Sequence, residues 1–243
     1  MKSKKSIKKR INILWIPGLG ANEMMYAKII EELNKTSYFF KHDFFKYYEV
    51  PLNTIKTLEE YADYSFEKNK DIIKKNYDFV VGTSLGGMLL QILFAKKKIK
   101  SKKYILLSTA FSKKDLTVLS QFSIFLLKWI KPKYRKIIQN LISNSYRIFR
   151  WNLKEKNVFS KMFKEFPTNV FFEAPLWIQN WEGIFPAFLE NKKIITIHGK
   201  RDPLLSYKKI AKKKKPDLSI SKGNHILFAT CPKLIAKKIF ELI

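Results

Sequence analysis

The sequence predicts an α/β fold, with a mostly parallel sheet of about six strands, helices on both faces and a helical insertion. Short, continuous apolar runs such as Ile11–Ile16 and Tyr104–Leu107 are typical of strands buried on both faces of a parallel sheet. Helix-length amphipathic segments alternate with these runs, but the alternation stops between residues 111 and 191. We therefore expect a core made of residues 1–110 and 192–243, with residues 111–191 as the insertion.

The same patterns predict the remaining elements in chain order. Asn22 or Glu23 begins a helix after the first strand, and Thr57 with Glu60 three positions later has the pattern of a capping box. The other elements expected in the core are a second strand within Phe44–Val50, a helix from Thr57 to near Tyr77, and later the strands Lys193–Ile197 and Leu218–Ser221 and a closing helix Leu234–Ile243. Within the insertion, helices are expected to break at Pro132, Pro167, Pro175 and Pro186.

The composition is that of a globular chain with an unusually high net charge of +28 over 243 residues. Of the 48 basic residues only five are arginine, and the lysines are spread along the whole chain, as an AT-rich coding sequence would produce. The alternative is a selected acidic partner; nucleic acid is the weakest option because no known binding motif is present. No apolar run reaches the roughly 18 residues of a membrane span, and the single cysteine, Cys231, suits a reducing cytoplasm.

The segment Asp78–Leu90 contains the motif most informative about chemistry. An apolar run ends in Gly82-Thr83-Ser84-Leu85-Gly86 and passes directly into an apolar segment of helix length, which predicts a strand, a tight turn and a helix. Such a turn strains its central residue, so the positions two residues to either side must lack bulk. Ser84 would then lie at a helix N-terminus, beside the backbone N–H of Leu85 and the positive end of the helix dipole. Ser84 is therefore a candidate nucleophile, with a plain glycine turn as the alternative.

A serine nucleophile needs a base, and the base needs a carboxylate partner. The chain has three histidines: His42, His198 and His225. His42 is expected to precede a strand, at the sheet edge opposite to the one where parallel sheets bind ligands. His198 and His225 each come after a strand near the end of the chain, and Asp202 follows the same strand as His198. The preceding strand ends in Ser108-Thr109 and offers no rival carboxylate.

Taken together, these motifs resemble the α/β-hydrolases. The Gly-x-Ser-x-Gly turn, Asp202 in Gly-Lys-Arg-Asp-Pro and His225 in Gly-Asn-His stand in the order of that family. The resemblance implies Ser84 as nucleophile, Asp202 as acid and His225 as base, with His198 structural. It also implies that Leu19, in the loop Pro17-Gly18-Leu19-Gly20, supplies the second oxyanion-hole N–H beside Leu85. Pro17 stands where the family often has histidine, so the hydrogen bonds of that histidine must be replaced or absent.

The resemblance also makes residues 111–191 a lid over the active site. This segment is rich in large apolar side chains, which we expect to pack in the core or to line a pocket. They are Phe122, Phe125, Leu126, Trp129, Phe149, Trp151, Phe159, Phe163, Phe171, Phe172, Trp177 and Trp181.

The loop Ile16–Asn22 and the turn Gly82–Gly87 look most like the carboxylesterases that remove the methyl ester from pimeloyl-acyl carrier protein in biotin synthesis. Acyl carrier proteins are acidic, and Arg135, Arg147 and Arg150 lie in the expected lid, where they could hold a phosphate bidentately. We thus expect a serine carboxylesterase without a metal or other cofactor, acting on a small-molecule or carrier-bound acyl ester. A broad-specificity carboxylesterase, an acyl-thioesterase and a non-catalytic binding protein remain open alternatives.

Overall fold

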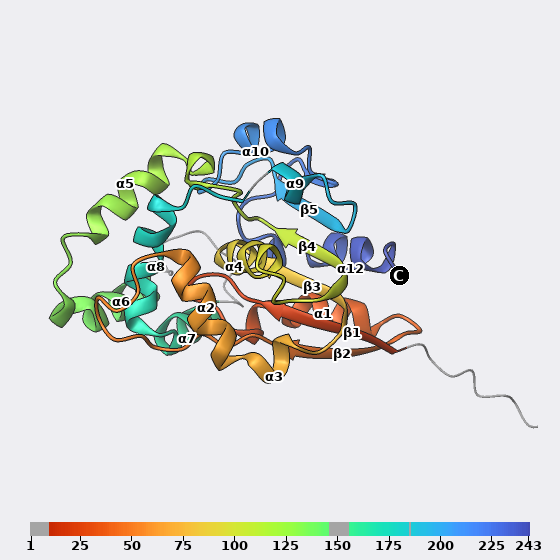
Figure 1. The fold of residues 1–243 in the computed structure, drawn as a ribbon, viewed down its shortest axis with the longest axis horizontal. Helices are drawn as coiled ribbons and strands as arrows, with labels where there is room; N and C mark the ends of the chain where they lie inside the picture. Colours follow the sequence, from red (N-terminus) through yellow and green to blue (C-terminus); the bar gives the residue numbers. More distant parts are fainter. Residues whose placement is uncertain (1–9, 146–155, 185) are drawn as a thin grey trace, which may run out of the picture.

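Six parallel strands form one sheet in the computed structural model, which describes residues 10–145, 156–184 and 186–243. Across the sheet the strands follow the order β2-β1-β3-β4-β5-β6 (Figure 1). Every pair of neighbouring strands in this described sheet is parallel, so the predicted fold class is confirmed. The strands are β1 (Arg10–Ile16), β2 (Phe39–Phe44), β3 (Tyr77–Thr83), β4 (Ser101–Leu107), β5 (Ile194–Gly199) and β6 (Leu218–Ile220).

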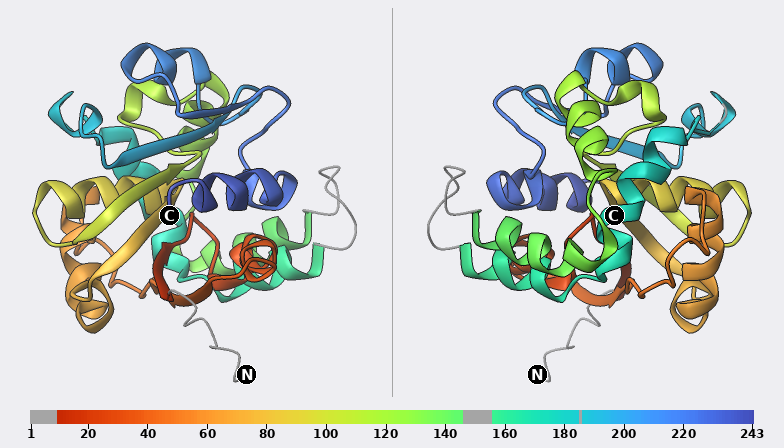
Figure 2. Two further views of the ribbon diagram at one scale, coloured as in Figure 1. Left: turned by 90° about the vertical axis from the view of Figure 1, so that its right-hand side faces the viewer. Right: turned by 90° about the vertical axis from the view of Figure 1, so that its left-hand side faces the viewer.

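The sheet is the middle of three layers, because successive side chains along each strand alternate between two apolar cores. Leu14 and Ile16 of β1 point into one core, whereas Ile13 and Trp15 point into the other. Figure 2 shows the helices that cover the two cores on opposite sides of the sheet. The first core is covered by α2 (Leu58–Lys68) and α4 (Leu85–Ala95), and the second by α1 (Ala27–Asn34), α11 (Leu227–Thr230) and α12 (Pro232–Phe240).

The order of the strands puts a topological switch point at β1 and β3. From β1 the chain grows outward to β2 and then returns to the other side of β1 to form β3. The helix that follows β1 therefore lies on one face of the sheet, and α4, which follows β3, lies on the other. In open parallel sheets, ligands bind beyond the carboxyl ends of the strands at such a point. The loop containing Leu19 and the turn containing Ser84 are the two segments that leave the sheet here.

The segment between β4 and β5 is helical, as predicted, and its helices up to Asn180 lie at the end of the molecule toward which the strands point (Figure 1). Helix α8 contacts both α5 and α6, so these helices form one group. Three of the four predicted breaks coincide with helix boundaries, but Pro175 lies inside α8 and does not end it. The helices are α5 (Val118–Leu127), α6 (Arg135–Ser145), α7 (Lys156–Glu165), α8 (Thr168–Asn180) and α9 (Pro186–Leu189), with single turns at Lys113–Asp115 and Pro132–Tyr134.

The second strand was placed wrongly by the sequence pattern. The strand is Phe39–Phe44, whereas Phe45 and Val50 are buried residues of the loop that follows. This strand pairs with β1 alone in the described sheet and carries lysine, histidine and aspartate, so it lacks the continuous apolar run of a central strand. His42 consequently lies within β2 and not before it, and its Nδ1 accepts a hydrogen bond of 3.0 Å from Trp15 Nε1.

The other core elements lie close to their predicted positions. Thr57 caps α2, and its hydroxyl accepts a 3.1 Å hydrogen bond from the Glu60 N–H. That helix ends at Lys68, and a short helix α3 (Lys70–Ile73) precedes β3. Beyond β5, helix α10 (Tyr207–Lys213) has Lys212 and Lys213 in its last turn. In the part of the chain that the structure describes, no helix is long and apolar enough to cross a membrane.

The large apolar side chains of the insertion divide into two sets. Phe159, Phe171, Phe172, Trp177 and Trp181 are buried, as expected, and Phe163 is half-buried. Phe149 and Trp151 lie outside the described residues. The prediction of a buried role is wrong for four residues of α5 and its C-terminal end, which are exposed to solvent: Phe122, Phe125, Leu126 and Trp129.

Candidate active site

The turn between β3 and α4 holds Ser84 in a strained backbone conformation. Ser84 has φ 52° and ψ −118°, a region that L-residues rarely occupy. A Cβ on Gly86 would lie 2.1 Å from the carbonyl oxygen of Ile16, and one on Gly82 would lie 2.7 Å from Cα of Gly87. Both glycines are therefore required for the close approach of α4 to the ends of β1 and β3. The turn is also tied to β4, since the Ser84 N–H donates a 3.0 Å hydrogen bond to Leu107 O.

The structure brings the three predicted catalytic side chains into one hydrogen-bonded chain. Ser84 Oγ lies 3.0 Å from Nε2 of His225, and His225 Nδ1 lies 2.8 Å from Oδ2 of Asp202. Asp202 follows β5 and His225 follows β6, and these are adjacent strands, so their loops meet beyond the same edge of the sheet. The arrangement allows His225 to accept a proton from Ser84 while the carboxylate holds its Nδ1–H.

The loop after β5 fixes the carboxylate of Asp202. Its side chain is fully buried, and its Oδ1 accepts hydrogen bonds from the N–H groups of Leu204 at 2.8 Å and Leu205 at 3.0 Å. Burial by itself raises the pKa of Asp202, but the charge and hydrogen bond of His225 outweigh it, so the pKa lies below its ordinary value. Asp202 is thus ionised at neutral pH, with one oxygen held by the loop and the other facing His225.

The two predicted oxyanion-hole donors flank Ser84. Leu85 begins α4, where the helix leaves its first N–H groups without intrahelical acceptors. The loop that contains Leu19 passes close to the serine, because a Cβ on Gly18 would lie 3.3 Å from Ser84 Cβ. Among the described residues, neither the Leu19 N–H nor the Leu85 N–H has a hydrogen-bond acceptor. Leu85 is thus next to Ser84 in the chain, and Leu19 follows the glycine that contacts Ser84.

Two tyrosines that the sequence analysis did not single out hold this loop in place. The Tyr47 hydroxyl donates a 2.5 Å hydrogen bond to the carbonyl oxygen of Pro17. The buried hydroxyl of Tyr26 lies 2.9 Å from both Ile16 O and Thr83 Oγ1, which links the ends of β1 and β3. Burial raises the pKa of Tyr26, so this hydroxyl stays protonated. No local pattern marks either tyrosine, because Tyr47 lies 30 residues from Pro17 and Tyr26 lies 57 residues from Thr83 in the sequence.

The other two histidines do not contact Ser84. His198 ends β5 and is 2% exposed, with its Nε2 3.5 Å from Asp202 Oδ2. Burial lowers the pKa of His198 to about 4, although the Asp202 carboxylate acts in the opposite direction. His198 is therefore neutral at physiological pH. Burial likewise lowers the pKa of His42, to about 4, at its position in the edge strand.

Of the three arginines expected to bind a phosphate, Arg135 alone lies in the described part of the chain. Arg135 Nη1 lies 2.7 Å from Oε1 of Glu173, and the two side chains are only 10% and 16% exposed. Its guanidinium also lies over the ring of Phe172. Because this charge is already neutralised inside the helical segment, Arg135 has no free face for a partner. Arg147 and Arg150 lie outside the described residues.

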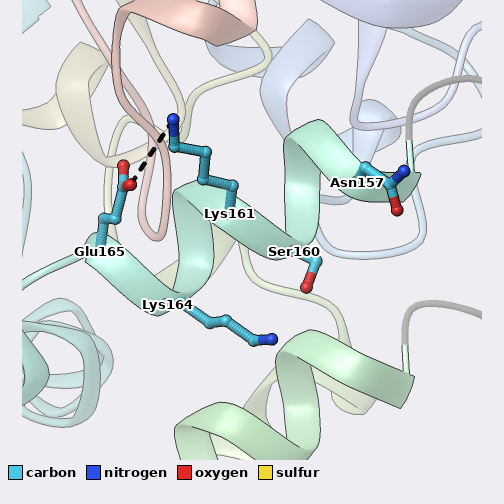
Figure 3. Close-up of a pocket in the computed structure, with 5 residues that line it drawn as sticks. All are labelled: Asn157, Ser160, Lys161, Lys164 and Glu165. Atoms are coloured by element: carbon cyan, nitrogen blue, oxygen red, sulfur yellow. Dashed lines mark ion pairs between the residues drawn. The ribbon is translucent and has the colours of Figure 1, made fainter.

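Two surface hollows occur near the helical segment, and neither is bordered by Ser84, Asp202 or His225. The larger one, of about 280 Å³, lies along the outer side of α7 (Figure 3). Its lining residues all come from this one helix, and a Lys161–Glu165 ion pair lies beside it. The smaller one, of about 170 Å³, touches the loop after β1 at residues 21–23. In the described chain, no cluster of three or more histidine, cysteine or acidic residues could hold a metal ion.

Comparison with known proteins gives matches of structure alone. No family model matches the chain, and no curated protein does. A thermophilic esterase from Thermogutta terrifontis has TM-score 0.69 and 14% identity over 96% of this chain and 89% of its own. A structure from a study of carboxylesterases of Nitrososphaera gargenis has TM-score 0.71 and 15% identity, over 95% and 89% of the two chains. A lipase-esterase related protein from Clostridium acetobutylicum has TM-score 0.66 and 17% identity, over 98% and 96%. Identities this low establish only a shared architecture, and on that basis the chain has the α/β-hydrolase fold.

Proposed function

We propose that this protein is a serine carboxylesterase, with Ser84 as nucleophile, His225 as general base and Asp202 as the acid that orients it. The observation that carries the proposal is the continuous hydrogen-bonded chain from Ser84 Oγ through His225 to Asp202. The strained turn at Ser84 supports it, because such strain is retained where it presents a reactive group. The esterase descriptions of the structural neighbours agree with this function.

The acylation step follows from these positions. Ser84 Oγ attacks the carbonyl carbon of the ester while its proton passes to His225 Nε2, which lies 3.0 Å away. The negative charge on the former carbonyl oxygen is held by the N–H groups of Leu19 and Leu85 and by the N-terminus of α4. His225 then gives the proton to the alcohol oxygen as the carbon–oxygen bond breaks. The products are the free alcohol and an acyl ester of Ser84.

Deacylation repeats the same transfers with water. His225 takes a proton from a water molecule, whose oxygen attacks the acyl carbon, and the proton then returns to Ser84 as the acid leaves. The ionised Asp202 stabilises the imidazolium that forms in both steps and holds the proton on Nδ1. The segment of residues 111–191 would act as a lid, since its helices α5 to α8 lie at the end of the molecule toward which the strands point.

The substrate that we propose is a small-molecule ester. The carrier-bound substrate, the methyl ester of pimeloyl-acyl carrier protein, was predicted from the resemblance of two loops with the support of three arginines, and one of these, Arg135, is paired with Glu173. That substrate stays a prediction, to be tested beside the small esters. Acyl-thioesters are the second candidate, because the same nucleophile and oxyanion donors serve both acyl groups.

Substitution of the nucleophile tests the function directly. Ser84→Ala should reduce kcat on p-nitrophenyl butyrate by at least about 10⁴-fold and abolish labelling by a fluorophosphonate probe. Ser219→Ala is the matched control, since this β6 hydroxyl bonds Tyr207 at 2.8 Å and should leave both readouts unchanged. Normal hydrolysis by Ser84→Ala would refute the assignment. A panel of p-nitrophenyl esters, acyl-thioesters and pimeloyl-acyl carrier methyl ester would then rank the substrates by kcat/KM.

A further inference from the structure

Helix α5 presents its apolar side to solvent. Val118, Phe122, Phe125 and Trp129 recur at intervals of four, three and four residues, so they share one face of the helix. Their exposed fractions are 83%, 58%, 48% and 74%, and Leu119 and Leu126 beside them are 58% and 49% exposed. A surface helix of a globular protein normally directs such a stripe toward the core. The orientation of α5 is the reverse.

Polar bonds on the opposite face hold α5 in this orientation. The Thr117 hydroxyl caps the helix and donates a 2.8 Å hydrogen bond to Pro203 O. One turn further on, Ser120 Oγ donates a 2.7 Å hydrogen bond to Leu204 O, and both Ser120 and Ile124 are buried. These contacts fix the rotation of the helix about its axis. The apolar stripe therefore cannot turn inward without breaking them.

The next helix, α6, and the single turn before it also expose apolar side chains. Tyr134, Ile137 and Leu141 follow one another at helical spacing and are 47%, 59% and 61% exposed. Helices α5 and α6 lie at the same end of the molecule, which faces the viewer in the right-hand view of Figure 2. We call these exposed residues the α5–α6 face: Val118, Leu119, Phe122, Phe125, Leu126, Trp129, Tyr134, Ile137 and Leu141.

The exposed charged residues within the segment that carries the α5–α6 face have one sign. Lys128, Lys131, Lys133 and Lys136 are exposed between and beside the apolar residues. The sequence contains no aspartate or glutamate between Asp115 and Glu155. Exposed aromatic and aliphatic side chains bordered by lysines, without acidic residues, are the composition of helices that lie in the interface of an anionic membrane. An even spread of lysines along the chain does not explain this local absence of acidic residues.

We propose that the α5–α6 face docks on the surface of an anionic lipid bilayer. The apolar side chains enter the boundary between headgroups and acyl chains, and the four lysines remain at the level of the lipid phosphates. A second copy of the chain fits this face poorly, because each copy carries a net charge of +28 and would set lysines against lysines. The bilayer satisfies both the apolar and the basic character of the face.

This position also brings the membrane next to the proposed active site. Pro203 and Leu204, which accept the hydrogen bonds from α5, directly follow Asp202. The loop that fixes the Asp202 carboxylate thus also fixes the base of the docking helix. Taken with the proposed esterase function, on which this one step rests, the arrangement suits esters that are dissolved in the lipid phase.

Vesicle binding by the purified full chain tests the proposal without any turnover. The chain should co-sediment with vesicles of 70% phosphatidylcholine and 30% phosphatidylglycerol, less with pure phosphatidylcholine, and less again in high salt. Phe122→Gln combined with Trp129→Gln should weaken binding at least about tenfold. The matched control combines Phe39→Gln with Leu234→Gln, which replace side chains that are 56% and 46% exposed outside the face, and it should bind as wild type does.

Tryptophan fluorescence gives a second readout. Among the described tryptophans only Trp129 is exposed, so its emission should shift to shorter wavelength on docking. Trp129→Phe should remove the shift and keep most of the binding. Ser84→Ala should bind vesicles normally, so loss of the proposed esterase activity is separate from loss of docking.

Three results would overturn the proposal. The first is that the wild-type chain binds neither kind of vesicle, or that the control variant loses as much binding as the α5 variant. The second is a dimer in sedimentation velocity that the α5 variant abolishes, which would make the face a contact between copies. The third is binding of an acidic carrier protein that depends on the same two aromatic residues while vesicles are not bound.

Discussion

Asp202→Asn is the substitution whose outcome the structure specifies most closely. In the wild-type chain, Oδ1 of Asp202 accepts two loop N–H groups and Oδ2 faces His225 Nδ1. An asparagine here has one acceptor oxygen and one NH₂ group. The oxygen must take the Oδ1 position, since an NH₂ group there would face the donors of Leu204 and Leu205. The NH₂ group then faces His225 and donates to its Nδ1.

This orientation forces the wrong tautomer on the base. With Nδ1 acting as acceptor, His225 carries its proton on Nε2, which lies 3.0 Å from Ser84 Oγ. Such an imidazole cannot take the serine proton. We expect kcat to fall by about 10³–10⁴, which corresponds to roughly 4–5.5 kcal/mol in the barrier, while KM changes little. The measurement is hydrolysis of p-nitrophenyl butyrate at pH 7.5.

Asp217→Asn is the control for this experiment. Asp217 also accepts a backbone N–H, from Thr196 at 2.8 Å, and its hydrogen bonds involve no histidine. Its substitution should leave kcat within about twofold of the wild type, and urea unfolding should show that both variants fold. If folded Asp202→Asn kept more than about a tenth of the wild-type kcat, the tautomer argument would fail.

Three further predictions concern stability, each measured by urea unfolding. Gly86→Ala should lower the free energy of unfolding by about 2–4 kcal/mol and remove most of the activity, because the added methyl group would meet Ile16 O. Stability equal to that of the wild type would contradict the strained turn. Burial lowers the pKa of His198 from 6.5 to about 4, so the folded protein holds this side chain neutral over a pH range in which the unfolded chain protonates it. The free energy of unfolding should therefore be highest above pH 6.5 and fall by on the order of 3 kcal/mol toward pH 4. His198→Asn should flatten this decline, and an unchanged pH slope would exclude His198 as its source. Arg135→Ala should lower the free energy of unfolding by about 2 kcal/mol, because it leaves the half-buried Glu173 unpaired, and it should not alter the salt dependence of hydrolysis. A changed salt dependence would restore a binding role for Arg135.

The central strands and the turn at Ser84 were predictable because their signals are local. A strand buried on both faces needs a continuous apolar run, and the tight turn needs glycine at positions 82 and 86. The edge strand β2 carries no such signal, since it has one neighbour in the described sheet and exposes charged side chains. The Arg135–Glu173 ion pair could not be predicted either, because its two residues are 38 positions apart in the sequence.

The tyrosines that support the oxyanion loop show a second limit of the sequence. Tyr26 and Tyr47 both bind carbonyl oxygens at the end of β1, where Pro17 replaces the histidine that the family resemblance implies. From the sequence, the hydrogen bonds of that histidine could be either replaced or absent, and no replacing residue could be named. A hydroxyl 30 residues away along the chain becomes a neighbour only after the strands have taken their order.

The periodicity of the sequence does not determine whether the apolar stripe of α5 faces the core or the solvent. A repeat of three and four residues establishes that a helix has an apolar side, but not that this side faces the protein. In α5 the direction is decided by Thr117 and Ser120, whose hydroxyls find carbonyl oxygens in the loop after Asp202. Turning the stripe inward would break both hydrogen bonds, each of which contributes about 0.5–1.5 kcal/mol net. The bonds that hold the acid loop therefore also hold the apolar side chains of α5 in solvent, where a membrane can cover them.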